Sequence, residues 1–337
     1  TMTWLRHRLG EEMSEEHYRR GGAYTMVNKY VSSAAHLRGK RLVSCEEMTN
    51  TYTVFNMTLE LLKIGGDQTA ISGVTHSIFH GFNYSPKEAP FPGWIRYGAY
   101  YNENNNWWPY FKYYTAYKGR MASALQHGTM YADIAILHPI ADMWSTLGMQ
   151  NEPFPATTNV KYKTLVWEAI HKNGSGCDYV SESIIRDAEM KDGYLCYGPR
   201  KYKTLFLIEV ESMEPATAHK LYDFVASGGR IFCIEAYPHK SVGLKDHDKH
   251  DKEVQEWVAK MKQMDGRFIL LHKPEKDFVG WYQGVQKDYG LTPYMTIEKP
   301  DPYLMQNRYQ GDNKEEMFFF SYAHRYNSCL LYTSQSP

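Results

Sequence analysis

The sequence lacks the signatures of several large protein classes. It has only five cysteines in 337 residues, and none are spaced as C-x-x-C, which argues against a zinc knuckle, a thioredoxin-type site or a disulfide scaffold. It contains no G-x-G-x-x-G, no G-x-x-x-x-G-K-[ST] and no G-x-S-x-G, so nothing indicates nucleotide binding or a serine nucleophile. No apolar run approaches the roughly 18 residues that a membrane span needs.

The chain also has no excess of positive or negative charge. Lys and Arg together number 38, as do Asp and Glu, so the formal net charge is zero. A nucleic-acid-binding protein would carry a basic stripe, and a membrane-surface protein a polybasic cluster. The sequence therefore predicts no nucleic-acid partner and no membrane span.

Aromatic residues, in contrast, are abundant. They make up 15% of the chain, with 28 Tyr, 14 Phe and 8 Trp, and there are also 14 His. Tyr and Trp combine a flat apolar face with a polar edge, which suits sugar rings, although large cores use aromatic residues too.

Helical and strand-like segments alternate in the first part of the chain. Periodicity predicts helices over 11–38 and 52–64, the second ended by Gly65-Gly66, and strands over 41–47 and 71–82. Polar residues stand at the carboxyl ends of both strands, where a (β/α)8 barrel builds its active site. A long aromatic loop over 83–106 and a helix over 107–127 follow.

Three parts are expected along the chain. Residues 1–130 are assigned to the C-terminal portion of a (β/α)8 barrel, 131–290 to a Rossmann-like or flavodoxin-like α/β domain, and 291–337 to the start of a β-rich module. The last nine residues, 329–337, read as a non-native tail. The charged run at 245–253 (KDHDKHDKE) is interpreted as a solvated loop entering a helix rather than a metal site.

The strongest chemical feature is the pair Glu46-Glu47 at the end of the strand over 41–47. Glycoside hydrolysis needs two carboxyl groups on opposite sides of the scissile bond, and one could stand here. The alternative is a surface carboxylate pair that merely follows a strand.

Two further motifs could contact a sugar. His76 and His80 fall on one face of the strand over 71–82, where they could bind hydroxyls or support the core. Asn105, Trp107 and Trp108 could bind and stack on sugar rings, or could form a helix N-terminus with the tryptophans packed inward.

Three segments together resemble a known family. AHLRGKRLVSCEEMT (35–49), GVTHSIFHGFNYSP (73–86) and the stretch from NNWWPYF through ADIAILHP (105–139) resemble glycoside hydrolase family 106, the α-L-rhamnosidases. The resemblance runs from about residue 20 to 145 and continues more weakly to about 325.

The resemblance implies a (β/α)8 catalytic domain and an inverting mechanism on α-L-rhamnosides of plant-type polysaccharides. Glu46 matches the family's general base, while Glu47 and Met48 replace a small residue and an aromatic one. The general acid is expected upstream of residue 1, so that the chain would be an inactive fragment. No cofactor is required by the sequence; the resemblance allows Ca²⁺, with ligands that cannot be mapped, and suggests a periplasmic or extracellular enzyme. The predicted substrate-binding residues are Glu47, His76, His80, Tyr84, Asn105, Trp107 and Trp108.

Two alternatives stay open at this stage. One is a retaining β-galactosidase of the family 42 type, which also joins a barrel to an α/β domain. The other is a non-catalytic relative that binds an oligosaccharide or polysaccharide without cleaving it.

Overall fold

A computed structural model describes residues 2–4, 25–49, 55, 57–94, 100–147 and 161–322. The chain divides into two compact units. Unit 1 consists of 1–35, 40–130 and 303–337, and unit 2 of 36–39 and 131–302. The start of the helix predicted over 11–38 and the tail 329–337 lie outside the described residues. No helix in the described ranges is long and apolar enough to cross a bilayer.

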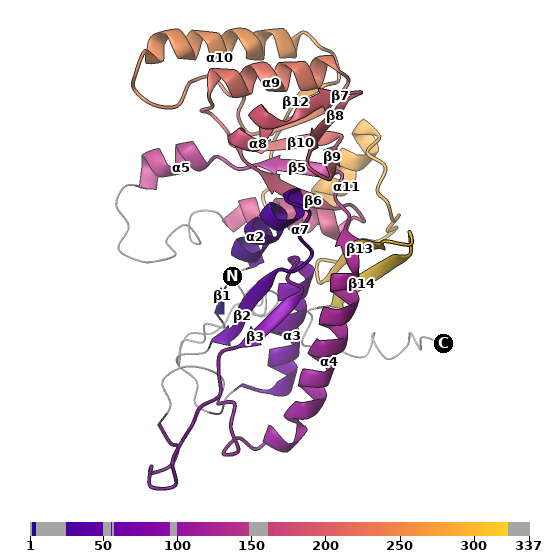
Figure 1. Ribbon diagram of the computed structural model, residues 1–337. Helices are drawn as coiled ribbons and strands as arrows, with labels where there is room; N and C mark the ends of the chain where they lie inside the picture. Colours follow the sequence, from indigo (N-terminus) through magenta and orange to yellow (C-terminus); the bar gives the residue numbers. More distant parts are fainter. Residues whose placement is uncertain are drawn as a thin grey trace. The chain divides into compact units, whose positions relative to one another are not determined.

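Unit 1 is built on a three-stranded parallel sheet with β2 in the middle (Figure 1). The helices α3 and α4 pack together and cover one face of β2 and β3. The elements of this part are β1 (Met2–Trp4), α2 (Thr25–Leu37), β2 (Ser44–Thr49), α3 (Leu59–Ile71), β3 (His76–Phe79) and α4 (Trp108–His127). The predicted alternation of helices and parallel strands is confirmed for these elements.

The predicted helix end at Gly65-Gly66 is wrong, because α3 runs through both glycines to Ile71. The strand predicted from residue 71 correspondingly begins only at His76. Gly66 serves packing: a Cβ there would lie 2.7 Å from the Tyr114 hydroxyl and 3.1 Å from Lys118 Nζ. The glycine lets α4 approach the α3 backbone, and both side chains reach carbonyl groups of α3.

A second, antiparallel sheet completes unit 1. Its strands are β4 (Gly128–Met130), β13 (Leu304–Gly311) and β14 (Glu316–Tyr322), in the order β14-β13-β4. Asn307 on β13 donates to the Ile71 carbonyl at the end of α3, at 2.8 Å. Of the strands within 291–337, β13 thus pairs with β4, which directly follows α4, and β14 pairs with β13.

Unit 2 contains a five-stranded parallel sheet with the order β12-β11-β10-β5-β6. The strands are β5 (Ile134–Leu137), β6 (Cys177–Val180), β10 (Thr204–Ile208), β11 (Arg230–Ile234) and β12 (Phe268–Leu271). Renumbered within the unit, this is the order 2-1-3-4-5 of flavodoxin-like doubly wound folds. Their apolar runs reflect burial on both faces of the sheet.

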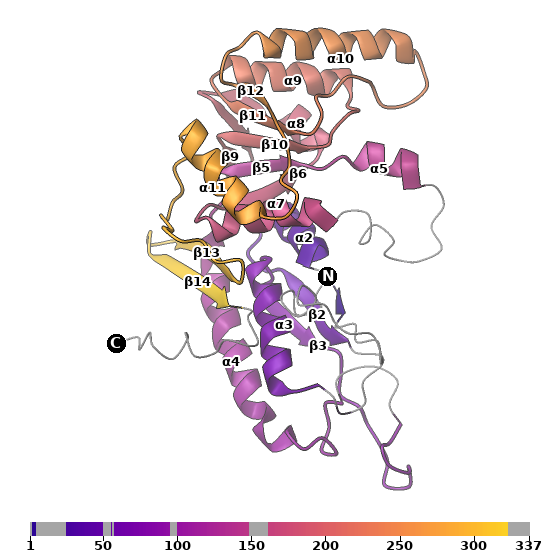
Figure 2. The same cartoon turned by 180° about the vertical axis from the view of Figure 1, so that it is seen from behind.

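Helices cover both faces of this sheet (Figure 2). On one face α9 and α10 pack side by side, and on the other α7 and α11 do so. The helices of unit 2 are α5 (Ile140–Leu147), α7 (Lys161–Lys172), α8 (Glu182–Asp187), α9 (Pro215–Ala226), α10 (His247–Lys262) and α11 (Phe278–Tyr289). A small antiparallel meander consists of β7 (Glu189–Lys191), β8 (Tyr194–Tyr197) and β9 (Arg200–Tyr202).

Asp178 on β6 forms a fully buried polar cluster in unit 2. The Tyr202 hydroxyl donates to its Oδ2 at 3.0 Å, and His36 Nδ1 lies 2.8 Å from Oδ1. Arg200 Nε lies 3.4 Å from Oδ2. Burial, and after it the Asp178 charge, raises the pKa of Tyr202 well above its usual range, so the phenol stays a neutral donor.

Tyr202→Phe is therefore expected to destabilise the protein by about 1.5–3 kcal/mol, because it removes one hydrogen bond to a buried charge without changing shape. Urea unfolding monitored by circular dichroism measures the loss. The matched control is Tyr194→Phe on the neighbouring strand, where the side chain is half-buried and a change within ~0.5 kcal/mol is expected. Equal effects of the two variants would contradict the role of the cluster.

Candidate active site

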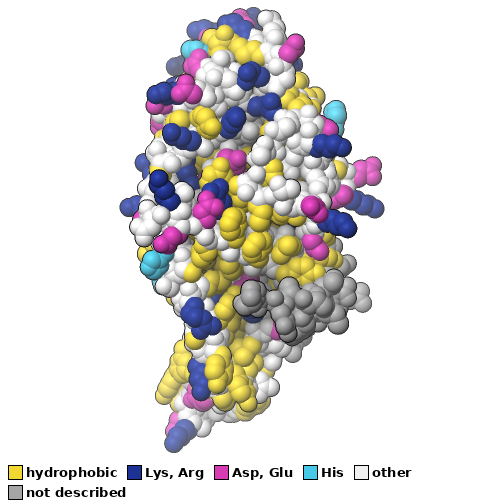
Figure 3. All heavy atoms as spheres, turned by 90° about the vertical axis from the view of Figure 1, so that its right-hand side faces the viewer, with side chains coloured by type: hydrophobic (Ala, Val, Ile, Leu, Met, Phe, Trp, Pro, Cys, Tyr) yellow, Lys and Arg dark blue, Asp and Glu magenta, His cyan; other side chains and the backbone are white. Residues whose placement is uncertain are grey.

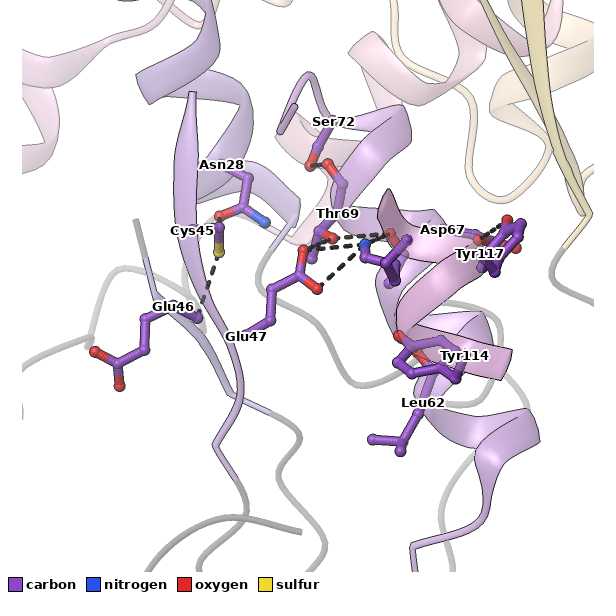
Figure 4. Close-up of polar contacts among 12 residues, drawn as sticks. Asn28, Cys45, Glu46, Glu47, Leu62, Asp67, Thr69, Ser72, Tyr114 and Tyr117 are labelled. Atoms are coloured by element: carbon purple, nitrogen blue, oxygen red, sulfur yellow. Dashed lines mark hydrogen bonds and ion pairs between the residues drawn. The ribbon is translucent and has the colours of Figure 1, made fainter. Parts of the chain in front are cut away.

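The two adjacent glutamates of β2 point to opposite sides of the sheet (Figure 4). This follows from strand geometry, since successive side chains alternate between the faces. Glu47 points toward α3 and α4, whereas Glu46 points away from these helices. The pair predicted from the sequence is therefore split between two environments.

Glu46 lies on the open face of the sheet, with 36% of its side chain exposed. Its Oε1 is 3.0 Å from Nδ1 of His80, whose side chain is 42% exposed. The register pairs Glu46 with Ile78, so the two strands bring His80, two residues further on, to the same face. The structure thus brings together the predicted base and one of the two predicted histidines.

Glu47 is completely buried. Its Oε1 accepts from the Thr69 hydroxyl of α3, and its Oε2 lies 3.2 Å from Nζ of Lys118 on α4. The lysine is also buried and donates to the Gly66 carbonyl at 3.2 Å. This is an ion pair sealed between the sheet and its two helices, and it leaves Glu47 no open side in the described structure from which to reach a sugar.

Thr69 and Lys118 were not among the residues predicted from the sequence. One signal for Lys118 was present: it follows the buried Tyr114 by four residues and precedes the buried Leu125 by seven, on the inward stripe of α4. A lysine on such a stripe requires a buried acceptor.

Two buried phenols stand near the Glu47–Lys118 pair. Burial, and after it the Glu47 charge, holds the pKa values of Tyr101 and Tyr114 well above their usual range. Tyr114 donates to the Leu62 carbonyl at 2.8 Å. Both phenols therefore stay neutral and serve as packing groups.

One residue of β2, directly after the glutamates, has an unusual backbone conformation. Met48 has a φ of +65°, in the left-handed region that non-glycine residues seldom adopt. Its side chain is fully buried in a cluster with Met57, Leu62 and Trp107. The residue in place of the family's aromatic position thus packs inward and does not join Glu46 on the open face.

His76 lies at the other end of β3 from His80. Its Nδ1 is 2.9 Å from the Ser44 hydroxyl, and Ser44 is its cross-strand neighbour. Alternation puts His76 and Ser44 on the face that carries Glu46, with the half-exposed Ile78 next along β3. The predicted pair of histidines shares one face, but the structure gives each a different partner.

The tryptophan motif divides between core and surface. Trp107 is buried and donates from Nε1 to the Met57 carbonyl at 2.7 Å, and Asn105 is buried and donates to the Tyr100 carbonyl at 3.3 Å. Trp108 is partly exposed and packs against Phe82 and Phe111, with centroids 6.0 Å and 5.5 Å away. Trp107 is the N-cap residue of α4, so no asparagine side chain caps this helix.

Exposed aromatic side chains occur in the loop after β3 and in the first turns of α4. Figure 3 shows hydrophobic surface, in yellow, in the lower part of the view. Tyr84 is 68% exposed, and Phe82, two residues beyond His80, is 61% exposed. The others are Phe91, Trp94, Tyr110 and Tyr113. Part of the predicted long loop, residues 95–99, lies outside the described residues.

Metal binding has no counterpart among the described residues: they contain no group of three His, Cys, Asp or Glu side chains arranged to hold an ion. The run predicted as a charged loop at 245–253 is largely the beginning of α10. The Ca²⁺ allowed by the family resemblance therefore stays a prediction without assigned ligands.

A family model described as alpha-L-rhamnosidase matches residues 2–289 of this chain. The chain belongs to the α-L-rhamnosidase family of glycoside hydrolases. The resemblance noted from the sequence is thereby confirmed.

Individual relatives of this chain also carry glycosidase names. A curated protein of Formosa agariphila, named "Putative beta-glucuronidase", is 29% identical over 293 residues, which is 86% of this chain and 22% of the relative. Among solved structures, a rhamnosidase from Novosphingobium sp. PP1Y has a TM-score of 0.63 at 18% identity, over 95% of this chain and 28% of that one.

A second structural relative is an exo-carrageenase of glycoside hydrolase family 42 from Bacteroides ovatus, with a TM-score of 0.55 at 11% identity. The match covers 96% of this chain and 42% of that one. At these identities the structures support the fold, and this chain spans less than half the length of each relative.

Proposed function

We propose that the enzyme containing this chain hydrolyses α-L-rhamnosides with inversion and that Glu46 is its general base. The observation that carries the proposal is the position of Glu46. The strand predicted to end at Glu46-Glu47 continues to Thr49, so Glu46 lies within β2, one residue before the last pair that this strand forms with β3. Glu46 is on the face away from the helices, is 36% exposed and lies close to His80. In a (β/α)8 barrel, the face away from the helices lines the interior, and the active site lies toward the carboxyl ends of the strands.

The reaction requires little of this chain beyond one well-placed carboxylate. Glu46 takes a proton from water as the water oxygen bonds to the anomeric carbon. The glycosidic carbon–oxygen bond breaks, and the leaving oxygen takes a proton from a general acid that is not assigned to any described residue. The charge of Glu46 is neutralised in the step, and inversion follows from attack on the opposite face.

The other predicted site residues fall into two groups in this proposal. Tyr84, which is exposed and follows His80 by four residues, and Trp108, which is partly exposed and packs against Phe82, are the aromatic groups suited to stacking on a sugar. His76 offers a hydrogen-bonding ring on the face of Glu46. Burial places Glu47, Asn105 and Trp107 in the supporting layer, so we propose no direct sugar contact for them.

The first-formed sugar tests the mechanism. Hydrolysis of p-nitrophenyl α-L-rhamnoside, followed by proton NMR before mutarotation, is expected to release β-L-rhamnose first. The enzyme should be expressed from its complete reading frame. Initial release of the α anomer would contradict inversion, because a retaining enzyme passes through a covalent intermediate and returns the original configuration.

Two other glycosidase activities have specific support. The Formosa relative bears the name of a glucuronidase, and the Bacteroides structure represents family 42, the family of the β-galactosidase alternative. Parallel assays with p-nitrophenyl β-D-glucuronide and β-D-galactoside distinguish them. Turnover of either, and not of the rhamnoside, would reassign the substrate, whereas sugar binding without turnover of any would favour a binding protein.

A further inference from the structure

His80 is fixed relative to Glu46 by the backbone as well as by the side-chain contact. The parallel ladder pairs Glu46 with Ile78 and Glu47 with Phe79. It continues one step past β3, since the His80 N–H donates to the Glu47 carbonyl at 3.0 Å. Backbone pairing therefore keeps His80 beside the part of β2 that carries Glu46.

The contact also indicates the tautomer of the ring. An ionised carboxylate has only acceptor oxygens, so a ring nitrogen that pairs with it must carry a hydrogen. The 3.0 Å contact between Nδ1 of His80 and Oε1 of Glu46 therefore fits the tautomer with the hydrogen on Nδ1. A charge-assisted contact of this kind restrains Oε1 and so favours one orientation of the carboxylate.

We propose that His80 is a positioning residue that orients Glu46 for proton abstraction, and not primarily a ligand of sugar hydroxyls. This inference rests on the proposed function. In this proposal His80 does not exchange a proton: the water proton passes to the Glu46 carboxylate as the new carbon–oxygen bond forms, and the glycosidic bond breaks with protonation of the leaving oxygen by the general acid.

The neighbouring histidine shows why position along the strand matters. His76 shares the strand and the face, but its Nδ1 meets the Ser44 hydroxyl instead of a carboxylate. In the described structure, the pairing of β2 with β3 brings the ring of His80, one residue past β3, to Glu46, whereas His76 pairs at the position of Ser44. The two histidines of one motif thus receive different roles.

The test compares variants that keep or remove the donor. His80→Leu is expected to lower kcat about 10- to 100-fold with KM changed less than about threefold, since it removes a hydrogen bond made to the reacting group. His80→Asn can place an amide N–H near the position of Nδ1 and is expected to retain kcat within about tenfold of the parent. His127→Asn, at the exposed end of α4, is the matched control and should leave both constants unchanged.

A double variant separates this inference from the proposed function. If His80 acts through Glu46, Glu46→Gln with His80→Leu should be no more than about threefold slower than Glu46→Gln alone. A raised KM with unchanged kcat in His80→Leu, or losses that multiply in the double variant, would overturn the positioning role. An active Glu46→Gln single variant would instead overturn the proposed function. His80→Asn supplies the comparison if His80→Leu does not fold.

Discussion

Replacing Glu46 by Gln is expected to lower kcat for α-L-rhamnoside hydrolysis by at least ~10³-fold, near the middle of the range for general acid–base catalysis. The amide has almost the shape of the carboxylate but cannot accept the proton of water. Because the side chain of Glu46 is 36% exposed, the fold is expected to stay intact. Initial rates on p-nitrophenyl α-L-rhamnoside measure the loss.

The same variant should still bind sugar, since a base that acts on water contributes mainly to the transition state. Calorimetric titration with L-rhamnose is expected to give an affinity within about threefold of the parent enzyme. Glu60→Gln, an exposed carboxylate in the first turn of α3, is the matched control and should retain full activity. A Glu46→Gln enzyme with more than a tenth of the parent activity would exclude Glu46 as the base.

Lys118→Met is expected to destabilise the protein by about 3–5 kcal/mol. The substitution preserves much of the side-chain volume and deletes the ammonium that lies 3.2 Å from Oε2 of Glu47. Glu47 would then be a fully buried carboxylate with only the Thr69 hydroxyl to support its charge. Urea denaturation measures the change, with Lys112→Met on the exposed face of α4 as the control.

Removing both charges should be far less harmful than removing one. The double variant Glu47→Leu with Lys118→Met is expected to recover most of the lost stability, because the desolvation cost of both ions disappears. A Lys118→Met protein within ~1 kcal/mol of the parent would show that the pair contributes little. So would a double variant whose loss equals the sum of the two single losses, because additive losses indicate uncoupled sites.

Much of the sheet architecture was predictable because buried parallel strands are continuous apolar runs. The segments 204–208 and 230–234 have this character, and the structure contains β10 and β11 there. The pairing of β13 with β4 was not predictable, since it joins residues almost 180 positions apart, Tyr309 and Met130. Periodicity describes what one segment buries and says nothing about which distant segment covers it.

The glycines at 65 and 66 show a different limit. Two glycines followed by an aspartate predict the end of a helix, because glycine destabilises a helix interior. Here the absence of a side chain lets α4 pack closely against α3. The hydrogen bonds of Tyr114 and Lys118 to α3 carbonyls then offset the lower helix propensity of glycine. Tertiary packing thus overrides the local preference.

Glu46 and Glu47 are adjacent in sequence but lie on opposite faces of the sheet, which matters when this protein is aligned with others. Two identical letters side by side leave an alignment free to slide by one column, and the slide would exchange a surface carboxylate for a sealed one. The lysine of α4 resolves the ambiguity, because it can reach only the glutamate on its own side of the sheet. In homologous sequences, the glutamate that pairs with an inward lysine of this helix corresponds to Glu47. The position before it corresponds to Glu46, the proposed base, and is the one to compare.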